Sequence, residues 1–247
     1  MIRAVIFDLG HTIWDIGPTG DVLARAYDNM RRTLAERTGR NDLPEAHVFQ
    51  RSVADVLREA APVYFEGGDV LDQPPTHAWV GEGFRRLGVD LDEELLRELT
   101  VPLFATEVDR LICAEGTVEA LLDLRDAGYA LGCITNTLTD EATIRLMLRN
   151  HGIEDLMRSV VVSAEEGYRK PHPSLFEKAL REVDVRAPEA VMVGDSPFHD
   201  IGGAKAVGMR AVLTHQYVVR PHEAFEPKPD AIIKHLRELR GVLDVLS

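Results

Sequence analysis

The stretch MIRAVIFDLGHT, residues 1–12, places a short apolar run directly before Asp8. Apolar runs of this length that contain β-branched residues are typical of a buried strand. In open α/β sheets, ligands bind at the carboxyl ends of the strands, where a carboxylate can act as a nucleophile that forms a covalent intermediate. A turn-capping role for Asp8 is the plainer alternative, so other segments of the chain must decide between the two.

The composition narrows the classes of partner. The chain has 247 residues, which suits one large domain or two modest ones. Its formal net charge of -13 argues against nucleic acid or an anionic membrane as a partner, because phosphate repulsion would act over a broad face. A phosphate ligand would then need a local counter-charge, either a metal ion or a placed lysine. The sequence gives no indication of the oligomeric state.

A cytoplasmic location is expected from three features of the sequence. No apolar stretch approaches the roughly 20 residues that are needed to cross a bilayer. The first apolar run breaks at Asp8 and lacks the small-residue cleavage site of a signal peptide. Cys113 and Cys133 match no metal-binding or redox spacing, so we expect two reduced thiols in the core.

The segment from Gly17 to Pro102 has helical periodicity and almost no strand signal. Helices are expected over 21–38, from 43 to about 60, and over 76–87, followed by a fourth helix that contains Leu95, Leu96 and Leu99. Asp90 and Glu93 have the spacing of a capping box at the start of that fourth helix. Helices without strands cannot belong to a sheet layer. We therefore predict a separate helical module, residues 17–102, inserted after the first strand.

From residue 103 onward, strands alternate with helices. Strands are expected over 129–134, 160–162, 191–193 and 211–213, and helices over 117–127, 139–150, 173–183 and 200–207, with a further strand and a closing helix between 230 and 246. This alternation implies right-handed crossovers and a parallel sheet that is covered on both faces. The predicted fold is thus α/β: a Rossmann-like, doubly wound core of residues 1–16 and 103–247, with an all-helical cap. The Pro-containing stretch 216–229 gives no clear pattern.

Two further segments carry polar groups to the ends of predicted strands. Thr135 and Asn136 follow a strand and could hydrogen-bond phosphoryl oxygens, although turn formation is the commoner role of this pair. Lys170 lies in GYRKPHP, residues 167–173, which two prolines stiffen. An exposed lysine is usually a solvated surface charge. One that is fixed beside proline is a better candidate for a cation that stabilises transition-state charge.

The most specific segment is VGDSPFHDIGGA, residues 193–204. It offers Asp195 and Asp200, two carboxylates five positions apart at a strand end and a helix start. Gly194 precedes the first of them and would let the chain turn sharply. Carboxylate oxygens are hard ligands that suit Mg²⁺. Asp200 could instead cap the following helix, and the two roles are compatible.

These four ordered segments together resemble the haloacid dehalogenase-like hydrolase superfamily, in the branch with a helical cap inserted after the first motif. The resemblance implies that Asp8 attacks the substrate, that Thr135 holds the phosphoryl group and that Lys170 neutralises charge. It also implies that Asp195 binds Mg²⁺ with support from Asp200. The implied substrate-binding residues are Leu9, Gly10, Thr135, Asn136 and Lys170, and the implied metal-binding residues are Asp8, Gly10, Asp195 and Asp200.

Gly10 departs from the family pattern. Phosphatases of this family usually carry a second Asp two positions after the nucleophile, as a general acid for the leaving group and a base for water. The family binds its metal at this position through the main-chain carbonyl, which glycine also has. The substitution therefore threatens proton transfer and spares metal binding. The neighbouring His11, with an ordinary pKa near ~6.5, could take over the proton transfer, but an inert His11 is the preferred interpretation.

The predicted function is a Mg²⁺-dependent phosphatase that acts on a small phosphorylated metabolite through an aspartyl-phosphate intermediate at Asp8. Dehalogenation is the first alternative, and Gly194-Asp195 disfavours it because dehalogenases of the superfamily have no carboxylate there. Carbon–phosphorus cleavage would need a cap lysine, and residues 17–102 contain none. A catalytically impaired regulator that binds phosphate or metal is the remaining alternative. Cap residues such as Arg25, His77 and Trp79 could select the substrate, but core packing or a solvated surface is their commoner role.

Overall fold

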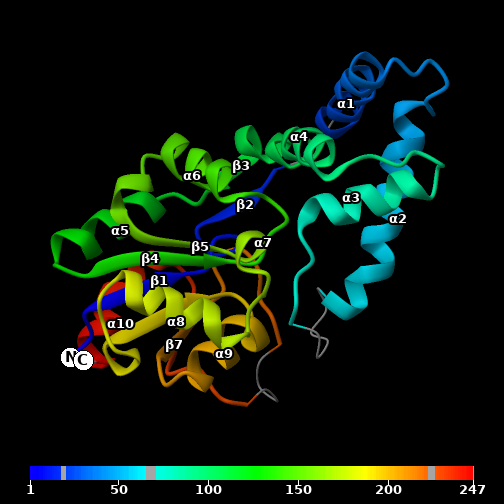
Figure 1. Ribbon diagram of the computed structural model, residues 1–247. Coiled ribbons are helices and arrows are strands. Elements are labelled where there is room, and N and C mark those ends of the chain that lie inside the picture. The colour runs from blue at the N-terminus through cyan, green and yellow to red at the C-terminus, as the bar shows by residue number, and fades with distance from the viewer. Residues whose placement is uncertain (18–20, 65–70, 222–225, 247) are drawn as a thin grey trace.

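A computed structural model describes residues 1–17, 21–64, 71–221 and 226–246. Its centre is a six-stranded sheet in the order β5-β4-β1-β6-β7-β8, in which every neighbouring pair is parallel. Helices cover this sheet, and a second group of helices stands to one side of it (Figure 1). The predicted α/β class, with a doubly wound parallel core and a helical cap, is confirmed.

The sheet strands lie close to the predicted ranges. They are Ala4–Phe7 (β1), Ala130–Thr135 (β4), Met157–Val162 (β5), Ala190–Gly194 (β6), Arg210–Thr214 (β7) and Ala231–Ile233 (β8). The strand expected at 160–162 begins earlier, at Met157. Arg158 is exposed and Ser159 is polar, so the first half of β5 lacks the continuous apolar run that predicts a buried strand.

Alternate residues of β1 pack on opposite faces of the sheet, as the two-residue period of a strand requires. Val5 and Phe7 join a hydrophobic cluster with α5, α6 and α10, whereas Ala4 and Ile6 join one with α8 and α9. These helices span Thr117–Asp126 (α5), Glu141–Asn150 (α6), Pro173–Glu182 (α8), Gly203–Ala206 (α9) and Leu239–Leu246 (α10). Burial on both faces explains why the first strand reads as an unbroken apolar run.

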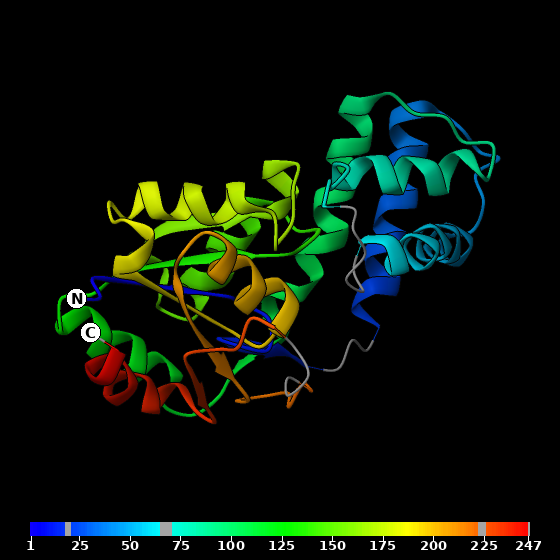
Figure 2. The same ribbon diagram turned by 90° about the horizontal axis from the view of Figure 1, so that it is seen from below.

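The helical cap has a hydrophobic core of its own. Its helices are Val22–Thr38 (α1), Ala46–Tyr64 (α2), Thr76–Arg85 (α3) and Glu93–Phe104 (α4). At its centre the rings of Phe49 and Phe84 lie 4.8 Å apart at an interplanar angle of 61°, and the cap cluster shares no residue with the two clusters of the sheet. Figure 2 shows the cap as a body beside the α/β core. Each region therefore buries its own apolar surface.

Several predicted helix ends in the cap are wrong. The capping box of Asp90 and Glu93 does not form: Asp92 caps α4, and its Oδ1 accepts a hydrogen bond from the Leu95 amide at 2.8 Å. Both aspartates can cap a helix, so spacing alone could not choose between them. Helix α2 begins and ends later than expected, at Ala46 and Tyr64. Helix α4 continues through Pro102 to Phe104, because a proline in the last turn removes only one hydrogen bond at an exposed position.

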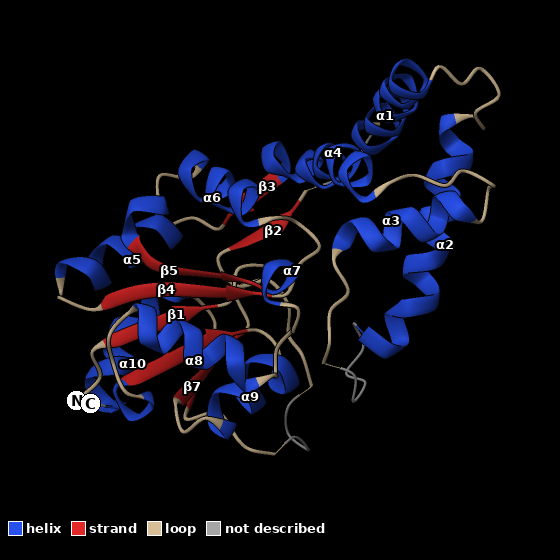
Figure 3. Ribbon diagram, viewed as in Figure 1, coloured by secondary structure: helices blue, strands red, loops and turns tan. Residues whose placement is uncertain are grey.

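A short antiparallel ribbon joins the two regions. Trp14–Ile16 (β2) pairs with Leu111–Cys113 (β3), so the chain enters and leaves the cap through paired strands (Figure 3). The 3₁₀ segment Ala105–Arg110 (η1) connects α4 to β3. Three-residue strands are too short to show a two-residue period, so this ribbon could not be predicted from the sequence.

The remaining elements are short turns. They are the helix Ser163–Glu166 (α7), the 3₁₀ turns Glu154–Leu156 (η2), Ala187–Glu189 (η3) and Leu236–Glu238 (η5), and the π-helical turn Pro197–Gly202 (η4). The helix predicted over 200–207 is wrong in its first half, which belongs to η4, and only α9 is α-helical. The strand and closing helix expected after Asp230 are confirmed as β8 and α10. Among the described residues, no helix is both long and apolar enough to cross a membrane.

Candidate active site

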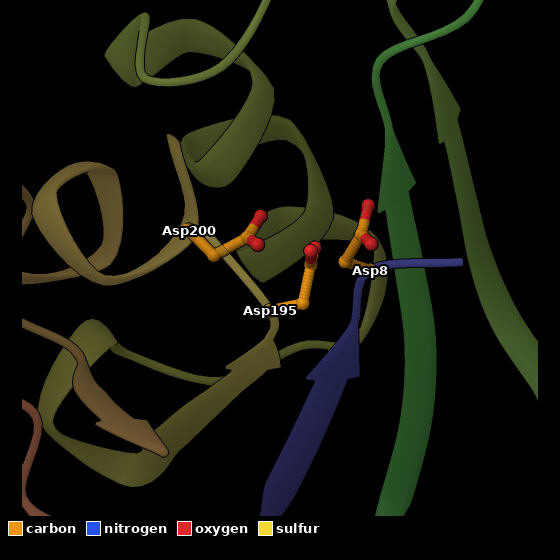
Figure 4. Close-up of side chains that lie close together, drawn as sticks. All are labelled: Asp8, Asp195 and Asp200. Carbon is orange, nitrogen blue, oxygen red and sulfur yellow. The ribbon is translucent and has the colours of Figure 1, made fainter. Parts of the chain in front are cut away.

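Three strands deliver polar side chains to one edge of the sheet. Asp8 follows β1, Thr135 ends β4 and Asp195 follows β6, and these strands are neighbours in the order β4-β1-β6. Their carboxyl ends share an edge because the strands are parallel. The turn η4 adds Asp200, and Figure 4 shows the three side chains lying close together. Oxygens of Asp8, Asp195 and Asp200 lie within 4.8 Å of one another, and all three residues are buried.

Lys170 is held at the centre of this cluster. Its Nζ donates hydrogen bonds to Asp8 Oδ1 at 2.6 Å, to Asp200 Oδ1 at 2.7 Å and to the Ile134 carbonyl at 2.9 Å. The residue is only 2% exposed. Burial opposes the ammonium charge, but the two carboxylates outweigh it and raise the pKa of Lys170 above its ordinary value. The lysine is thus a fixed cation whose three donors are all directed, rather than a surface charge.

Asp8 lies in surroundings that disfavour its charge. Burial raises the pKa of Asp8 from 3.8 to about 7, Lys170 opposes this rise, and the charges of Asp200 and Asp195 add to it. Burial likewise raises the pKa of Asp195, which the guanidinium of Arg220 opposes. Burial therefore outweighs the compensation by the cations of Lys170 and Arg220, and a further cation beside the carboxylates would favour their ionised forms.

Asp200 folds back over Gly194. Its Oδ2 accepts a hydrogen bond from the Ser196 amide at 2.9 Å, and a Cβ at position 194 would lie 2.2 Å from the same oxygen. Gly194 is therefore required by the close approach of a carboxylate, and the expected sharp turn is not the reason. The alternative role of Asp200 as a helix cap is wrong, because Ser196 caps η4 by accepting a hydrogen bond from the His199 amide at 3.1 Å.

The donor set of this site fits a magnesium ion. Magnesium prefers hard oxygen ligands and is usually held by few protein carboxylates together with substrate phosphate. Asp8, Asp195 and Asp200 present such oxygens from rigid positions, and Gly10 lines the same cavity. Burial is the main cause that raises the pKa of Asp8 and of Asp195, and a cation bound beside them would favour their ionised forms.

Position 10 leaves open space beside the nucleophile candidate. A Cβ built on Gly10 would meet no atom within 4 Å, and the backbone there lies outside the left-handed region. His11 adopts a positive φ of 56°, a conformation in which non-glycine residues are uncommon. Its Nδ1 lies 3.1 Å from Oδ1 of Asp15 in the ribbon. The His11 Nδ1 thus faces Asp15, and Gly10 has no side chain to fill the space at position 10.

The two remaining predicted substrate-binding residues, Leu9 and Asn136, have different contacts. Leu9 and Asn136 line the cavity together with Gly10, Thr135 and Lys170. The Leu9 side chain packs in the core, and its carbonyl accepts a hydrogen bond from the Ile13 amide at 2.8 Å. Asn136 binds the Lys170 main chain twice: its Oδ1 accepts from the Lys170 amide at 2.8 Å, and its Nδ2 donates to the Lys170 carbonyl at 3.2 Å. Asn136 therefore ties two loops of the site together.

A cavity of about 570 Å³ opens over these residues. Sequence reasoning missed three of its charged or titratable lining residues, namely Arg169, His199 and Arg220. Arg220 lies in the stretch without a clear pattern, and its Nε is 2.5 Å from Asp195 Oδ2. Burial lowers the pKa of His199 to about 4, so its imidazole is neutral at neutral pH.

The cavity belongs to the core and the ribbon. Among the cap side chains that the structure describes, those of residues 21–60 and 71–104, none lines it. The cap candidates for substrate selection, Arg25, His77 and Trp79, are therefore placed elsewhere: Trp79 is buried in α3, and its Nε1 donates to the Pro74 carbonyl at 3.0 Å. For Trp79 the packing role is the one the structure supports.

Comparison with known proteins gives a consistent picture. The family model described as haloacid dehalogenase-like hydrolase matches residues 2–208. A glyceraldehyde 3-phosphate phosphatase of Methanopyrus kandleri is 30% identical over 100% of this chain and 99% of its own length. A protein of the same name from Pyrococcus abyssi is also 30% identical, over 86% of this chain and 81% of its own length.

Two solved structures resemble the whole fold. A 2-haloacid dehalogenase from Pseudomonas syringae pv. Tomato DC3000 has a TM-score of 0.69 and 27% identity, with all of both chains covered. A HAD phosphatase from Thermococcus onnurineus has a TM-score of 0.62 and 28% identity, with 98% of each chain covered. Phosphatases and a dehalogenase therefore share this architecture.

Proposed function

The chain belongs to the haloacid dehalogenase-like hydrolase family, and from that premise we propose that it is a Mg²⁺-dependent phosphatase of small phosphorylated metabolites. The observation that carries the proposal is the convergence of Asp8, Asp195 and Asp200 around the Lys170 ammonium group. Dehalogenation needs one attacking carboxylate, whereas phosphoryl transfer also needs positive charge to balance the phosphate. The full-length relatives named as phosphatases support the same choice.

In the proposed reaction, an Asp8 carboxylate oxygen attacks phosphorus while the ester P–O bond breaks. The leaving oxygen departs as an alkoxide or phenolate and takes its proton from water. The aspartyl-phosphate that forms is then hydrolysed by water, which returns the carboxylate and releases inorganic phosphate. Lys170 holds Asp8 in place and balances negative charge as it develops. Magnesium, held by Asp8, Asp195, Asp200 and the Gly10 carbonyl, would reduce the repulsion between the phosphate and the nucleophile.

Gly10 sets the limits of this reaction. With no carboxyl group at position 10, the chain lacks the side chain that usually protonates the leaving group and activates water in this family. His11, whose Nδ1 faces Asp15, stays an unassigned alternative for that role. We therefore propose an enzyme that handles activated phosphates readily and hydrolyses its phospho-enzyme slowly.

We propose that the substrate is a small phosphate ester. We also propose that the protein is soluble and acts in the cytoplasm. The relatives from Methanopyrus kandleri and Pyrococcus abyssi are named for glyceraldehyde 3-phosphate. A cavity of about 570 Å³ with Arg169 and Arg220 in its lining suits a compact anion of that kind. The free thiols of Cys113 and Cys133 support a reducing compartment.

A panel of phosphorylated metabolites, assayed with Mg²⁺ and with a chelator, tests this proposal. We expect phosphate release only with the metal, and the fastest release from compact substrates such as glyceraldehyde 3-phosphate. Equal phosphate release in the chelator would contradict the magnesium assignment. The complete absence of phosphate release from the panel would contradict the phosphatase assignment.

A dehalogenase is the second candidate, because a 2-haloacid dehalogenase shares the fold over the whole chain and Gly10 removes the usual phosphatase carboxylate. The same preparation should therefore be offered a 2-haloacid and assayed for halide release in the chelator. We expect no halide release, because the carboxylates of Asp195 and Asp200 would repel the carboxylate of a 2-haloacid. Halide release at a rate above that of phosphate release would reverse the ranking.

A further inference from the structure

One segment of the cap reaches the active-site loops without lining the cavity. Residues 71–76, which we call the strap, lead into α3 and run alongside the core (Figure 1). The Arg169 amide donates to the Leu71 carbonyl at 2.9 Å, and the Gln73 amide donates to the Gly167 carbonyl at 2.8 Å. Asp72 and Tyr168 thereby form an isolated antiparallel bridge. The strap thus pairs, strand to strand, with the residues directly before Lys170.

The same strap also binds the loop that follows Thr135. The Gln73 side chain donates from Nε2 to the Thr137 carbonyl at 2.8 Å, and the Thr76 hydroxyl donates to the Leu138 carbonyl at 2.7 Å. Gln73 is 3% exposed, so its amide is committed to this contact inside the protein. The strap therefore touches two loops of the core at once.

Those two loops carry the phosphate-binding and charge-balancing residues. Asn136, between Thr135 and Thr137, is hydrogen-bonded twice to the Lys170 main chain. A continuous path of hydrogen bonds thus runs from Gln73 through the 135–138 loop to Lys170, whose ammonium group holds Asp8. Gln73 main-chain and side-chain groups hold the two loops at a fixed separation.

We propose that Gln73 is a positioning residue through which the docked cap sets the geometry of Thr135 and Lys170. The proposal rests on the proposed phosphatase function. Small displacements at a reacting centre are costly, since an error of about 1 Å can lower a rate by about 10²-fold. Because the strap acts on the core loops and not on the substrate, its loss should slow the turnover of every phosphate ester to a similar degree.

The variant Gln73→Met tests this role, since methionine has a similar length and cannot donate a hydrogen bond. We expect kcat to fall about 10- to 100-fold at saturating Mg²⁺, by the same factor for an aryl phosphate and for the best metabolite, with little change in KM. The matched control is Gln50→Met in α2, a cap glutamine that lines a separate cavity with Tyr27 and Leu103, which should keep the kcat of the unaltered protein. A loss confined to the larger substrate, or one confined to KM, would overturn the proposal.

A second pair of variants serves if Gln73→Met does not fold. Thr76→Val removes the hydroxyl that binds the Leu138 carbonyl, and Thr76→Ser keeps it. We expect a lower kcat for Thr76→Val and a return to the original kcat for Thr76→Ser. An equal kcat for the two variants would show that the hydroxyl does not position the loop and would overturn the proposal for this contact.

Hydrogen exchange separates this proposal from the phosphatase assignment, because it needs no substrate. In Gln73→Met the amides of residues 136–138 and 167–170 should exchange faster than in the unaltered protein, while those of β1 should not change. Unchanged exchange in both loops would overturn the positioning role even if the protein is a phosphatase. Faster exchange in a protein that hydrolyses no phosphate ester would keep the role and contradict the function.

Discussion

The core and the cap of this protein contribute to the active site in different ways. The core supplies the buried ionisable side chains Asp8, Lys170, Asp195 and Asp200 from strand ends and adjoining turns. The apolar residues of the cap pack in a separate cluster around Phe49 and Phe84, and its described side chains do not line the cavity. The cap nevertheless binds both loops that flank the site, through the strap at residues 71–76.

This difference teaches that proximity to the substrate and influence on catalysis are separable. Side chains at the ends of parallel strands meet because the sheet fixes them, so the chemistry of the core follows from its topology. The described residues of the cap reach the same chemistry through hydrogen bonds to loops, and such bonds can break when the cap moves. Variants in the two regions should therefore leave different kinetic and thermodynamic signatures.

The largest effect is expected from Asp8→Asn in the core. An amide cannot act as the nucleophile, so steady-state turnover should fall by more than about 10⁴-fold. The hydrogen bond from Lys170 Nζ can still be accepted by the amide oxygen, so the fold should persist. Phosphate release measures the first expectation, and circular dichroism with thermal unfolding measures the second. If Asp8→Asn turned over nearly as fast as the unaltered protein, Asp8 could not be the nucleophile.

The next largest effect concerns Gly10 and acts in the opposite direction. A positioned general acid or base contributes about 10²–10⁴ in rate, and a side chain at position 10 has open space around its Cβ. With an aryl phosphate, the unaltered protein should release about one equivalent of phenolate in a burst and then turn over slowly. Gly10→Asp should raise the steady-state rate and remove the burst, as rapid-mixing absorbance would show.

His11 provides the control for that experiment. If the unaltered protein turns over rapidly without a burst and His11→Ala abolishes the turnover, then His11 performs the proton transfer. In that case Gly10 is no handicap. His11→Ala with unchanged kinetics would leave the interpretation of Gly10 as it stands.

How much of this site the sequence could predict depends on the range of the interactions involved. Asp8 and Asp195 follow apolar runs, so their place at strand ends is a local property. Gly194 is fixed by the approach of the Asp200 carboxylate, a tertiary contact that leaves no local pattern. Gln73 lies in a Pro-containing stretch and meets Thr137, 64 positions along the chain. Periodicity carries no information about such a pair, so Gln73 could not be found from the sequence.

The separation of the two hydrophobic cores can be tested by stability. Phe84→Ala in the cap should cost about 3–5 kcal/mol of cap stability, because it leaves a cavity under a ring that is fully buried. The only two tryptophans of the chain report the regions separately, with Trp14 in the ribbon beside the core and Trp79 in the cap. In urea, the transition seen through Trp79 should shift to a lower concentration while that of Trp14 stays. Phe176→Ala in the core is the reciprocal control, and coincident shifts would make the protein one cooperative unit.

A smaller effect is expected from pH. Burial raises the pKa of Asp8 to about 7, and Asp8 must be ionised to attack, so activity should fall as the pH drops through that pKa. Magnesium favours the ionised carboxylate, so raising its concentration should move this acid limb to lower pH. The acid limb reports the ionisation of Asp8, a core residue, so Gln73→Met should lower kcat without shifting the pH at which activity falls. An acid limb that is independent of Mg²⁺ would argue against Asp8 as both nucleophile and ligand.

The smallest effect is expected from Trp79→Phe, and it decides how the cap acts. The substitution keeps an aromatic ring in α3 but removes the hydrogen bond from Nε1 to the Pro74 carbonyl, which holds the strap. A single hydrogen bond contributes about 1 kcal/mol, so kcat should fall only a few-fold. Because the ring does not line the cavity, the decrease should be equal for an aryl phosphate and for a bulkier metabolite. A change in preference between those substrates, measured as the ratio of their kcat/KM values, would show that Trp79 meets the substrate when the cap closes. The cap would then select the substrate as well as position the active-site loops. Direct contact with the substrate would no longer separate the core from the cap.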